Sequence, residues 1–277
     1  MNPILIAALV VLILFVVLQI TYVICIRPSK KNQEEMQKYK GVKFAHRGLH
    51  NDEVPENSLT AFRLAVEAGF GIELDVHTAK CGTPVVFHDG TLTRMTGTED
   101  RLCNFTASEL SEMRLKGTDE KIPTFAEVLE LVGGKVPLVV ELKQDEGEEG
   151  VAQAAADLLK KYDGPFIVES FNPFTLADFG RCMPNVPRGI LSQRFTNKEG
   201  KRKLKFFIAE HMLTNAVCKP DFIAFSKNDA RFISLRMAKA IYEPFTIAWT
   251  IRSPEEEAHA YQNGFDSVIF ENYIPEK

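Results

Sequence analysis

The sequence predicts an α/β protein: a (β/α)8 barrel of the TIM type with an antiparallel hairpin extension, preceded by one N-terminal transmembrane helix. Three observations lead to this prediction. The chain opens with a long uncharged apolar stretch, short β-branched or aromatic runs alternate with helical patterns through the remainder, and one pair of runs is too close together for a crossover helix. The composition is globular, with 45% hydrophobic and 25% charged residues in 277, and the formal net charge of −4 disfavours a nucleic-acid-binding protein.

The first element is the segment Met1–Ile26, which contains no Asp, Glu, Lys or Arg. As a helix, the 24 residues of Pro3–Ile26 reach roughly 36 Å at about 1.5 Å per residue, which exceeds a hydrocarbon core of about 30 Å. A buried core helix would show polar positions at helical spacing, and Ile4–Val17 has none. A cleaved signal peptide is the other alternative, but no basic residue precedes the apolar core and no A-x-A-like site follows it. We therefore interpret residues 1–26 as a transmembrane anchor.

The orientation of this anchor is predicted from its flanking cations. Arg27, Lys30 and Lys31 follow the span and no basic residue precedes it, so the large domain is expected in the cytoplasm. The five cysteines fit a reducing compartment, because their number is odd and no CxxC spacing occurs. Residues 27–40 are expected to form a juxtamembrane linker or short helix, and residues 41–277 the barrel domain.

Nine short runs are the strand candidates: Val42–Ala45, Gly71–Val76, Pro84–Phe87, Leu138–Leu142, Phe166–Ser170, Arg188–Leu191, Asp221–Phe225, Phe245–Thr250 and Asp266–Phe270. Helical patterns separate most of them. One begins after Ser58, a possible N-cap, and ends at Gly69, and another covers Thr124–Val132. Regular alternation of strands and helices indicates a parallel sheet.

The second and third runs break this alternation. Gly71–Val76 and Pro84–Phe87 are joined by a short segment containing Cys81-Gly82, which indicates an antiparallel hairpin. If Cys81 and Gly82 are the two turn residues, His88 lies opposite Asp75. Without the return strand, eight parallel strands remain, the number that closes a barrel with its active site at the C-terminal strand ends.

Polar residues that are unusual for a protein core cluster at these strand ends: His46, Arg47, Glu73, Asp75, His88, Asp89, Glu141 and Lys143. Residues two apart in a strand project to the same face, so Glu73 and Asp75 form a carboxylate pair. Three carboxylates without cysteine ligands suit a hard cation, Ca²⁺ or Mg²⁺, rather than Zn²⁺. The alternative is that each acid is an ordinary exposed charge at the end of a loop.

Two histidines, His46 and His88, give this cluster groups that can donate and accept protons near neutral pH. A single histidine is more often structural than catalytic, but His46 and His88 both lie beside acids, and a facing pair of imidazoles supplies a general acid and a general base. Arg47 and Lys143 suit a phosphate anion. Together these groups indicate an enzyme that cleaves phosphodiesters.

Six motifs occur in a fixed order: F-A-H-R-G, P-E-N-S-x-x-A-F, G-I-E-L-D-V, P-V-V-F-H-D-x-x-L-x-R, I-P-T-F-x-E-V-L and V-E-L-K. From Gly41 to Asn272 the chain resembles the glycerophosphodiester phosphodiesterase family. The resemblance implies the following roles: His46 and His88 as acid and base, Glu73, Asp75 and Glu141 as ligands of one divalent cation, and Arg47 and Lys143 as phosphate ligands. It also implies that Asn57 lies near the site and that Trp249 packs against the glycerol moiety of the substrate.

The activity implied by the resemblance is metal-dependent hydrolysis of a glycerophosphodiester to glycerol 3-phosphate and an alcohol. Arg252 stands where the family commonly has Asn, which leaves the head group of the substrate open. A lysophospholipase D acting on membrane lysolipids is one alternative. A non-catalytic membrane protein that binds phosphorylated head groups is another, but it would be expected to lack one of the histidines or carboxylates.

A basic run made up of Lys201, Arg202, Lys203 and Lys205 precedes Phe206 and Phe207. Its cations belong either to a solvated helix face or to a surface that rests on the anionic cytoplasmic leaflet. The sequence favours the solvated face.

Overall fold

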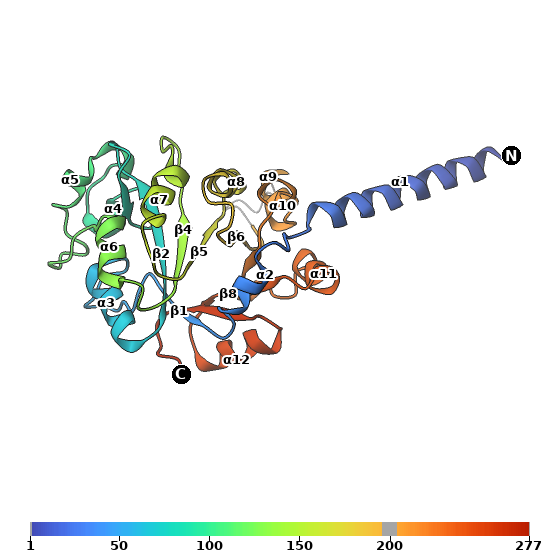
Figure 1. Cartoon of the computed structure of the whole chain (residues 1–277). Helices are drawn as coiled ribbons and strands as arrows, with labels where there is room; N and C mark the ends of the chain where they lie inside the picture. Colours follow the sequence, from blue (N-terminus) through green and yellow to red (C-terminus); the bar gives the residue numbers. More distant parts are fainter. Residues whose placement is uncertain (1, 196–203, 277) are drawn as a thin grey trace.

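The computed structural model describes residues 2–195 and 204–276. In this part of the chain the strands are β1 (Lys43–His46), β2 (Gly71–Thr78), β3 (Pro84–Val86), β4 (Leu138–Leu142), β5 (Phe166–Ser170), β6 (Arg188–Ser192), β7 (Phe222–Ser226), β8 (Phe245–Ile251) and β9 (Ser267–Phe270). They follow the order β1-β9-β8-β7-β6-β5-β4-β2, and a further pairing of β1 with β2 closes the ring (Figure 1). The prediction of a closed barrel of eight parallel strands with one antiparallel addition, β3, is confirmed.

The helices of the described residues are α1 (Pro3–Cys25), α2 (Gln33–Gln37), α3 (Leu59–Ala68), α4 (Thr93–Thr96), α5 (Ala107–Leu110), α6 (Phe125–Val132), α7 (Val151–Leu159), α8 (Pro173–Cys182), α9 (Leu204–Glu210), α10 (Asn215–Cys218), α11 (Ile233–Tyr242) and α12 (Pro254–Gln262), with two 3-10 turns at Leu102–Asn104 and Lys227–Asp229. The predicted ends of α3 are confirmed. The hydroxyl of Ser58 accepts a hydrogen bond from the backbone N–H of Ala61, and Gly69 ends the helix at φ 71°. Thr124 caps α6 in the same way, in a capping box with Glu127.

The hairpin of β2 and β3 differs from the prediction by one residue in register. Val76 pairs with Val86, and Phe87 rather than His88 comes opposite Asp75, where its N–H donates to the Asp75 carbonyl over 3.0 Å. The reason is the turn. Ala79 donates to the Thr83 carbonyl, so three residues rather than two form the loop, with Gly82 at φ 78°. His88 therefore follows the strand instead of pairing within it.

The segment expected to be a linker or short helix contains α2 and packs against the barrel. Met36 is fully buried and Tyr39 is nearly so, in a cluster with residues at the N-terminal ends of the strands such as Phe222 and Phe245. This segment therefore closes the end of the barrel opposite the candidate site.

Helix α1 is the one described helix that is long and apolar enough to cross a membrane, and none of its most apolar window is buried. It leaves the barrel beside α9, α10 and α11 and extends into open space (Figure 1). A signal sequence near an N-terminus has the same properties, so its length and composition leave both interpretations open. All five cysteines are free.

The basic run lies mostly outside the described residues. Lys201, Arg202 and Lys203 fall in the segment that is not described, while Lys205 lies in α9 with its Nζ 5.3 Å from the centre of the Phe206 ring.

Candidate active site

The candidate site lies where the parallel strands end. His46 is the last residue of β1, Asp75 lies in β2, and Glu141 is the penultimate residue of β4. Registers across the sheet bring them together, because His46 pairs with Glu73 and Asp75 pairs with Glu141. The closed barrel thus places side chains from distant parts of the chain together at the open end formed by the carboxyl ends of the strands, here named the mouth.

Three carboxylates form the centre of this mouth. Each of Glu73, Asp75 and Glu141 is at least 93% buried, and one oxygen from each lies within 4.8 Å of the others. Burial and repulsion from its neighbours raise the pKa of Glu73 well above its ordinary value, and burial raises the pKa of Glu141 to about 7. Packed carboxyl groups with raised pKa values, and no sulfur among them, form a donor set suited to a hard divalent cation.

Two cations contact the same carboxylates. Nζ of Lys143 lies 3.1 Å from Asp75 and 2.8 Å from Glu141, and Nε of Arg47 lies 3.3 Å from Asp75. Burial by itself raises the pKa of Asp75, but these two charges outweigh it and hold the pKa well below its usual range. The amide nitrogen of Asn57 donates to the same carboxylate over 2.8 Å. Lys143, Arg47 and Asn57 thus all favour the ionised form of Asp75.

His46 is held from one side by an acid that sequence reasoning missed. Nδ1 of His46 lies 2.5 Å from Oε2 of Glu271, and its Nε2 lies 3.9 Å from Oε2 of Glu73. Burial lowers the pKa of His46, and the hydrogen bond that its ring donates to Glu271 partly offsets this effect. One ring nitrogen is thus fixed by Glu271 and the other faces the carboxylate cluster.

His88 has an equivalent arrangement. Its Nδ1 lies 2.6 Å from Oδ1 of Asp89, and the other oxygen of Asp89 accepts a hydrogen bond from Nε of Arg94 over 2.6 Å. Burial lowers the pKa of His88, while the charge of Asp75 raises it. Asp75 also raises the pKa of His46, so this carboxylate acts on both imidazoles. Although the predicted register was wrong, His88 still lies at the cluster.

Glu56 links the two halves of the site. It accepts hydrogen bonds from Arg47 over 2.7 Å and from two nitrogens of Arg94 over 2.7 and 2.8 Å. Burial raises its pKa, but the two guanidinium groups outweigh this effect and lower the pKa to about 2. The network connects the loop after β1 with the loop after β3 and fixes Arg47 at the mouth.

Trp249 lies at the opposite wall, in β8. Its ring packs edge-on against Phe171 at a centroid distance of 5.6 Å, and the indole Nε1 is buried without a hydrogen-bond partner among the described residues. The ring centroids of Phe171 and Phe195 are 6.1 Å apart, and Phe195 stacks on Phe206 of α9 with 5.8 Å between the ring centroids. These three phenylalanines and Trp249, here named the aromatic row, run from the candidate site toward α9.

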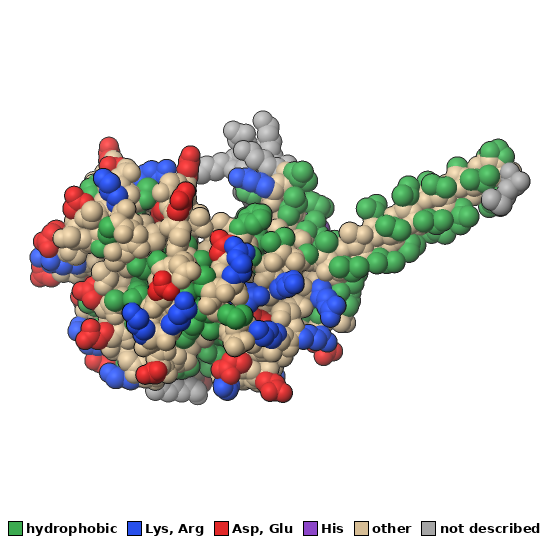
Figure 2. Space-filling view, turned by 45° about the horizontal axis from the view of Figure 1, so that its top comes forward, with side chains coloured by type: hydrophobic (Ala, Val, Ile, Leu, Met, Phe, Trp, Pro, Cys, Tyr) green, Lys and Arg blue, Asp and Glu red, His purple; other side chains and the backbone are tan. Residues whose placement is uncertain are grey.

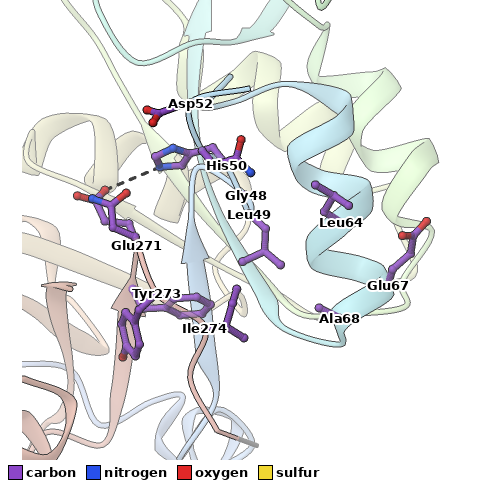
Figure 3. A pocket seen from close by; sticks show the side chains of 13 residues that line it. Gly48, Leu49, His50, Asp52, Leu64, Glu67, Ala68, Glu271, Tyr273 and Ile274 are labelled. Carbon is purple, nitrogen blue, oxygen red and sulfur yellow. Dashed lines mark ion pairs between the residues drawn. The ribbon is translucent and has the colours of Figure 1, made fainter. Parts of the chain in front are cut away.

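A cavity of about 660 Å³ adjoins the site between the loop after β1 and the segment after β9. His50 and Glu271 face each other at one end of it and Glu67 lies at the other (Figure 3). Nε2 of His50 is 3.9 Å from Oε2 of Glu271, so His46, His50 and Glu271 form a second cluster with metal-ligand atoms within 4.8 Å. Since Glu271 already bonds His46, we assign this cluster to the support of His46.

Glu169 of β5 is a further acid absent from the sequence prediction. It pairs in register with Glu141, is 1% exposed, and has a buried Oε2 without a partner in the described residues. Burial and the charge of Glu141 raise its pKa well above the ordinary value. A weak signal was present for each missed acid: Glu169 lies in a predicted strand, and Glu271 follows the last predicted strand.

The predicted site residues thus lie together at one end of the barrel. The sequence model of the glycerophosphoryl diester phosphodiesterase family matches residues 46–273, which is most of the chain. The chain belongs to this family. The match begins at the end of β1 and leaves out α1 and the segment under the barrel, so membership says nothing about those parts.

Individual relatives agree with the family assignment. The glycerophosphodiester phosphodiesterase of Caldanaerobacter subterraneus is 38% identical over 160 residues, an alignment that covers 54% of this chain and 65% of its relative, just under two thirds. A Bacillus subtilis glycerophosphodiester phosphodiesterase is 25% identical over 256 residues, covering 83% of this chain and 82% of that protein. A solved structure of an Oleispira antarctica phosphodiesterase with the product sn-glycerol-3-phosphate superposes with a TM-score of 0.68 at 27% identity, covering 85% of this chain and 94% of the other.

Proposed function

We propose that this phosphodiesterase hydrolyses glycerophosphodiesters to glycerol 3-phosphate and an alcohol, in a reaction that depends on one divalent cation, Ca²⁺ or Mg²⁺. One observation carries the proposal. Two imidazoles lie at a buried three-carboxylate cluster, and each imidazole has its Nδ1 fixed by a separate acid. Each acid fixes the orientation of its imidazole and stabilises its charged form, as a general acid and a general base require.

The cation is assigned to Glu73, Asp75 and Glu141. These residues offer oxygen ligands at mutual distances that one ion can bridge, and two of them have raised pKa values that a nearby positive charge would lower. The bound cation would supply positive charge to the phosphate as negative charge builds up on it.

Arg47 and Lys143 are assigned to the phosphate. Both project into the mouth and lie within 3.3 Å of Asp75, so they are next to the position of the cation. The guanidinium of Arg47 is oriented by Glu56, which leaves it a fixed direction from which to donate hydrogen bonds to phosphate oxygens.

His46 and His88 transfer the protons. One imidazole takes the proton of the attacking hydroxyl, and the other gives a proton to the alkoxide that leaves phosphorus. Glu271 and Asp89 each stabilise the charged form of their imidazole during this exchange. The attacking hydroxyl is either water or the 2-hydroxyl of the substrate glycerol, and both routes use the same two histidines.

Asn57 and Trp249 complete the substrate site in this proposal. Asn57 holds Asp75 through its amide and is 2% exposed, which makes it a support for the centre of the cluster. Trp249 offers an apolar ring face for glycerol, and its indole N–H, which no described residue accepts from, as a donor to the glycerol hydroxyls.

We also propose that α1 is a membrane anchor and that the catalytic domain lies on the cytoplasmic side. The helix has 23 residues and a mean hydropathy of 3.1, and none of its most apolar window is buried against the barrel. The first cations of the chain follow it, at Arg27, Lys30 and Lys31.

A lysophospholipid is the second candidate substrate, and the aromatic row is the observation that favours it. An acyl chain attached to the glycerol would need an apolar surface leading away from the phosphate site, and Phe171, Phe195 and Phe206 provide one. On this interpretation, Phe206→Ala raises the KM for lysophospholipids and leaves the KM for soluble glycerophosphodiesters unchanged.

The experiment that tests the proposed function measures release of the head-group alcohol, a product common to both substrate classes, by the full-length protein in detergent. Glycerophosphodiesters and lysophospholipids with the same head groups are compared in EDTA and after addition of Ca²⁺ or Mg²⁺. We expect hydrolysis only with the cation, and its loss in Glu141→Gln but not in Glu67→Gln, which changes an exposed carboxylate. Turnover in EDTA would refute the metal dependence. Binding of phosphorylated head groups without turnover would favour the non-catalytic alternative.

A further inference from the structure

The junction between α1 and the barrel is rigid. Tyr22 Oη lies 3.3 Å from Nδ1 of His211, which follows α9, and Tyr242 at the end of α11 donates to the Val23 carbonyl over 2.8 Å. Asn215 at the start of α10 donates to the Ile26 carbonyl over 3.0 Å. The last turn of the apolar helix is therefore held by three elements of the barrel wall.

The chain beyond α1 is equally fixed. Ile26 is fully buried, the N–H of Ser29 donates to the Pro220 carbonyl over 2.7 Å, and the amide of Asn32 donates to Asp221 over 3.0 Å. These contacts leave no free linker on which the barrel could swing. The position of α1 in a membrane therefore also fixes the position of the barrel wall around its base.

The length of α1 sets how close that wall comes to the lipid. Its 23 residues extend about 35 Å at 1.5 Å each, whereas the hydrocarbon core is about 30 Å thick and each headgroup layer adds roughly 5 to 7 Å. The turn containing Tyr22 and Val23 then falls at the boundary between hydrocarbon and headgroups. Because that turn already contacts His211 and Tyr242, the wall must reach the headgroup layer.

The wall exposes apolar side chains at this place. Phe207, Val217 and Ile241 are 43%, 50% and 47% exposed, and each lies within four residues of a residue that holds α1. Hydrophobic side chains gather on the barrel next to the base of α1 (Figure 2).

The rings at the base of α1 also contact one another. The Phe207 ring lies 4.2 Å from the His211 ring, which in turn packs edge-on against Tyr22 at 5.9 Å. Aromatic rings with one polar edge are typical of the membrane interface.

We propose that the α9–α11 face, defined by Phe207, Val217 and Ile241, rests in the headgroup layer of the bilayer that α1 spans. The proposal depends on the membrane anchor of the proposed function. The α9–α11 face contacts a lipid surface in this proposal, because the face surrounds the base of α1, the one described helix apolar enough to span a membrane, and is continuous with that helix.

This placement has a consequence for the active site. Phe206, the residue before Phe207, belongs to the aromatic row that ends at Trp249. Consecutive helical residues project about 100° apart, so the lipid-facing wall and the aromatic row lie on adjacent sides of the same helix, α9. The mouth then opens beside the membrane surface rather than away from it.

The test uses the full-length protein in liposomes that contain brominated lipids, which quench tryptophan at close range. The native protein has one tryptophan, Trp249, which provides a constant background. Phe207→Trp and Ile241→Trp add a reporter on the proposed face. Ile274→Trp, at a 66% exposed position near the C-terminus, is the matched control. We expect the added fluorescence of the first two variants to be blue-shifted and strongly quenched by bromine, and that of the third to be quenched by aqueous acrylamide instead.

Two outcomes overturn the proposal. In one, F207W and I241W are quenched by bromine no more than I274W. In the other, they are shielded from both quenchers, which would show that a protein surface or a second copy covers the face. Alkaline carbonate extraction separates this failure from that of the anchor, because a protein released from the membrane has no spanning helix. Unchanged hydrolysis by all three variants confirms that they are folded.

Discussion

Replacing Glu271 with Gln tests whether this carboxylate enables the acid–base role of His46. Its Oε2 lies 2.5 Å from Nδ1 of His46, which directs the other ring nitrogen to the carboxylate cluster. Gln keeps the size of the side chain but removes the charge that stabilises an imidazolium. We expect kcat to fall by about 10²- to 10⁴-fold with little change in KM, the range for a mispositioned catalytic imidazole. At about 1.36 kcal/mol per tenfold, this is a loss of roughly 2.7 to 5.4 kcal/mol of transition-state stabilisation.

The pH dependence of E271Q has a defined direction. Burial lowers the pKa of His46, and the hydrogen bond and charge of Glu271 raise it. Without Glu271 the pKa falls further. A general base is lost below its pKa and a general acid is lost above it, so in either role the limb governed by His46 moves to lower pH. The assay is kcat/KM between about pH 5 and about pH 9, where imidazoles titrate.

Glu271 also pairs with Arg252, at 2.6 Å to Nε and 2.5 Å to a terminal nitrogen, and this contact requires its own control. Arg252→Gln removes that ion pair while leaving the contact with His46. Glu67→Gln, at the far end of the same cavity, controls for the loss of a carboxylate. A wild-type kcat and an unmoved pH profile in E271Q would refute the positioning role.

Three further predictions concern the metal, the second imidazole and the segment under the barrel. Burial raises the pKa of Glu141 from its ordinary 4.5 to about 7, so the stability that its protonated form contributes is lost as the pH rises through this window. Ca²⁺ or Mg²⁺ should therefore raise the Tm more at about pH 8 than at about pH 5. Equal shifts of the Tm at the two pH values would contradict this. His88→Ala should lower kcat by about 10²-fold or more at an unchanged Tm, and a wild-type rate would remove His88 from the mechanism. Met36→Ala should lower the free energy of unfolding by about 2 to 5 kcal/mol in denaturant titrations, and a change well below this range would show that the segment is loosely attached.

The fold was predictable because its signals are local and repeated. The cap at Ser58 and the terminator at Gly69 set one helix, and Thr124 and Gly133 set α6 in the same way. The hairpin register was not predictable from composition, since Cys81-Gly82 is compatible with a loop of two or of three residues. Hydrogen bonding of Ala79 to Thr83 selects three, and one residue changes which side chain faces Asp75.

The site was only partly predictable for a related reason. Residues two apart in one strand share a face, so Glu73 and Asp75 could be paired from the sequence. The contact of His46 with Glu271 joins residues 225 positions apart, and it exists only because β9 closes the barrel against β1. No local sequence pattern predicts such a long-range partner. The same holds for Glu169, which meets Glu141 only through the register of two parallel strands.

Charge balance at the mouth gives the cation a further role. The buried acids of the cluster are Glu73, Asp75, Glu141 and Glu169. Lys143 and Arg47 both contact Asp75, whose pKa is held well below its usual range, while burial raises the pKa of each of the other three acids. Without a bound cation, Lys143 is paired with Asp75 and Glu141, and Arg47 is paired with Asp75 and Glu56.

A divalent ion between these acids would change what the two basic side chains can do. It would neutralise Asp75 in their place and leave Lys143 and Arg47 able to donate hydrogen bonds to a phosphate. We therefore expect the cation to bind before the substrate. Calorimetric binding of glycerol 3-phosphate should be weak in EDTA and strengthen when Ca²⁺ or Mg²⁺ is added, and His88→Ala should retain this dependence because it removes no ligand of the cation. Equal affinity with and without the cation would mean that Arg47 and Lys143 are free to bind phosphate while still paired with Asp75.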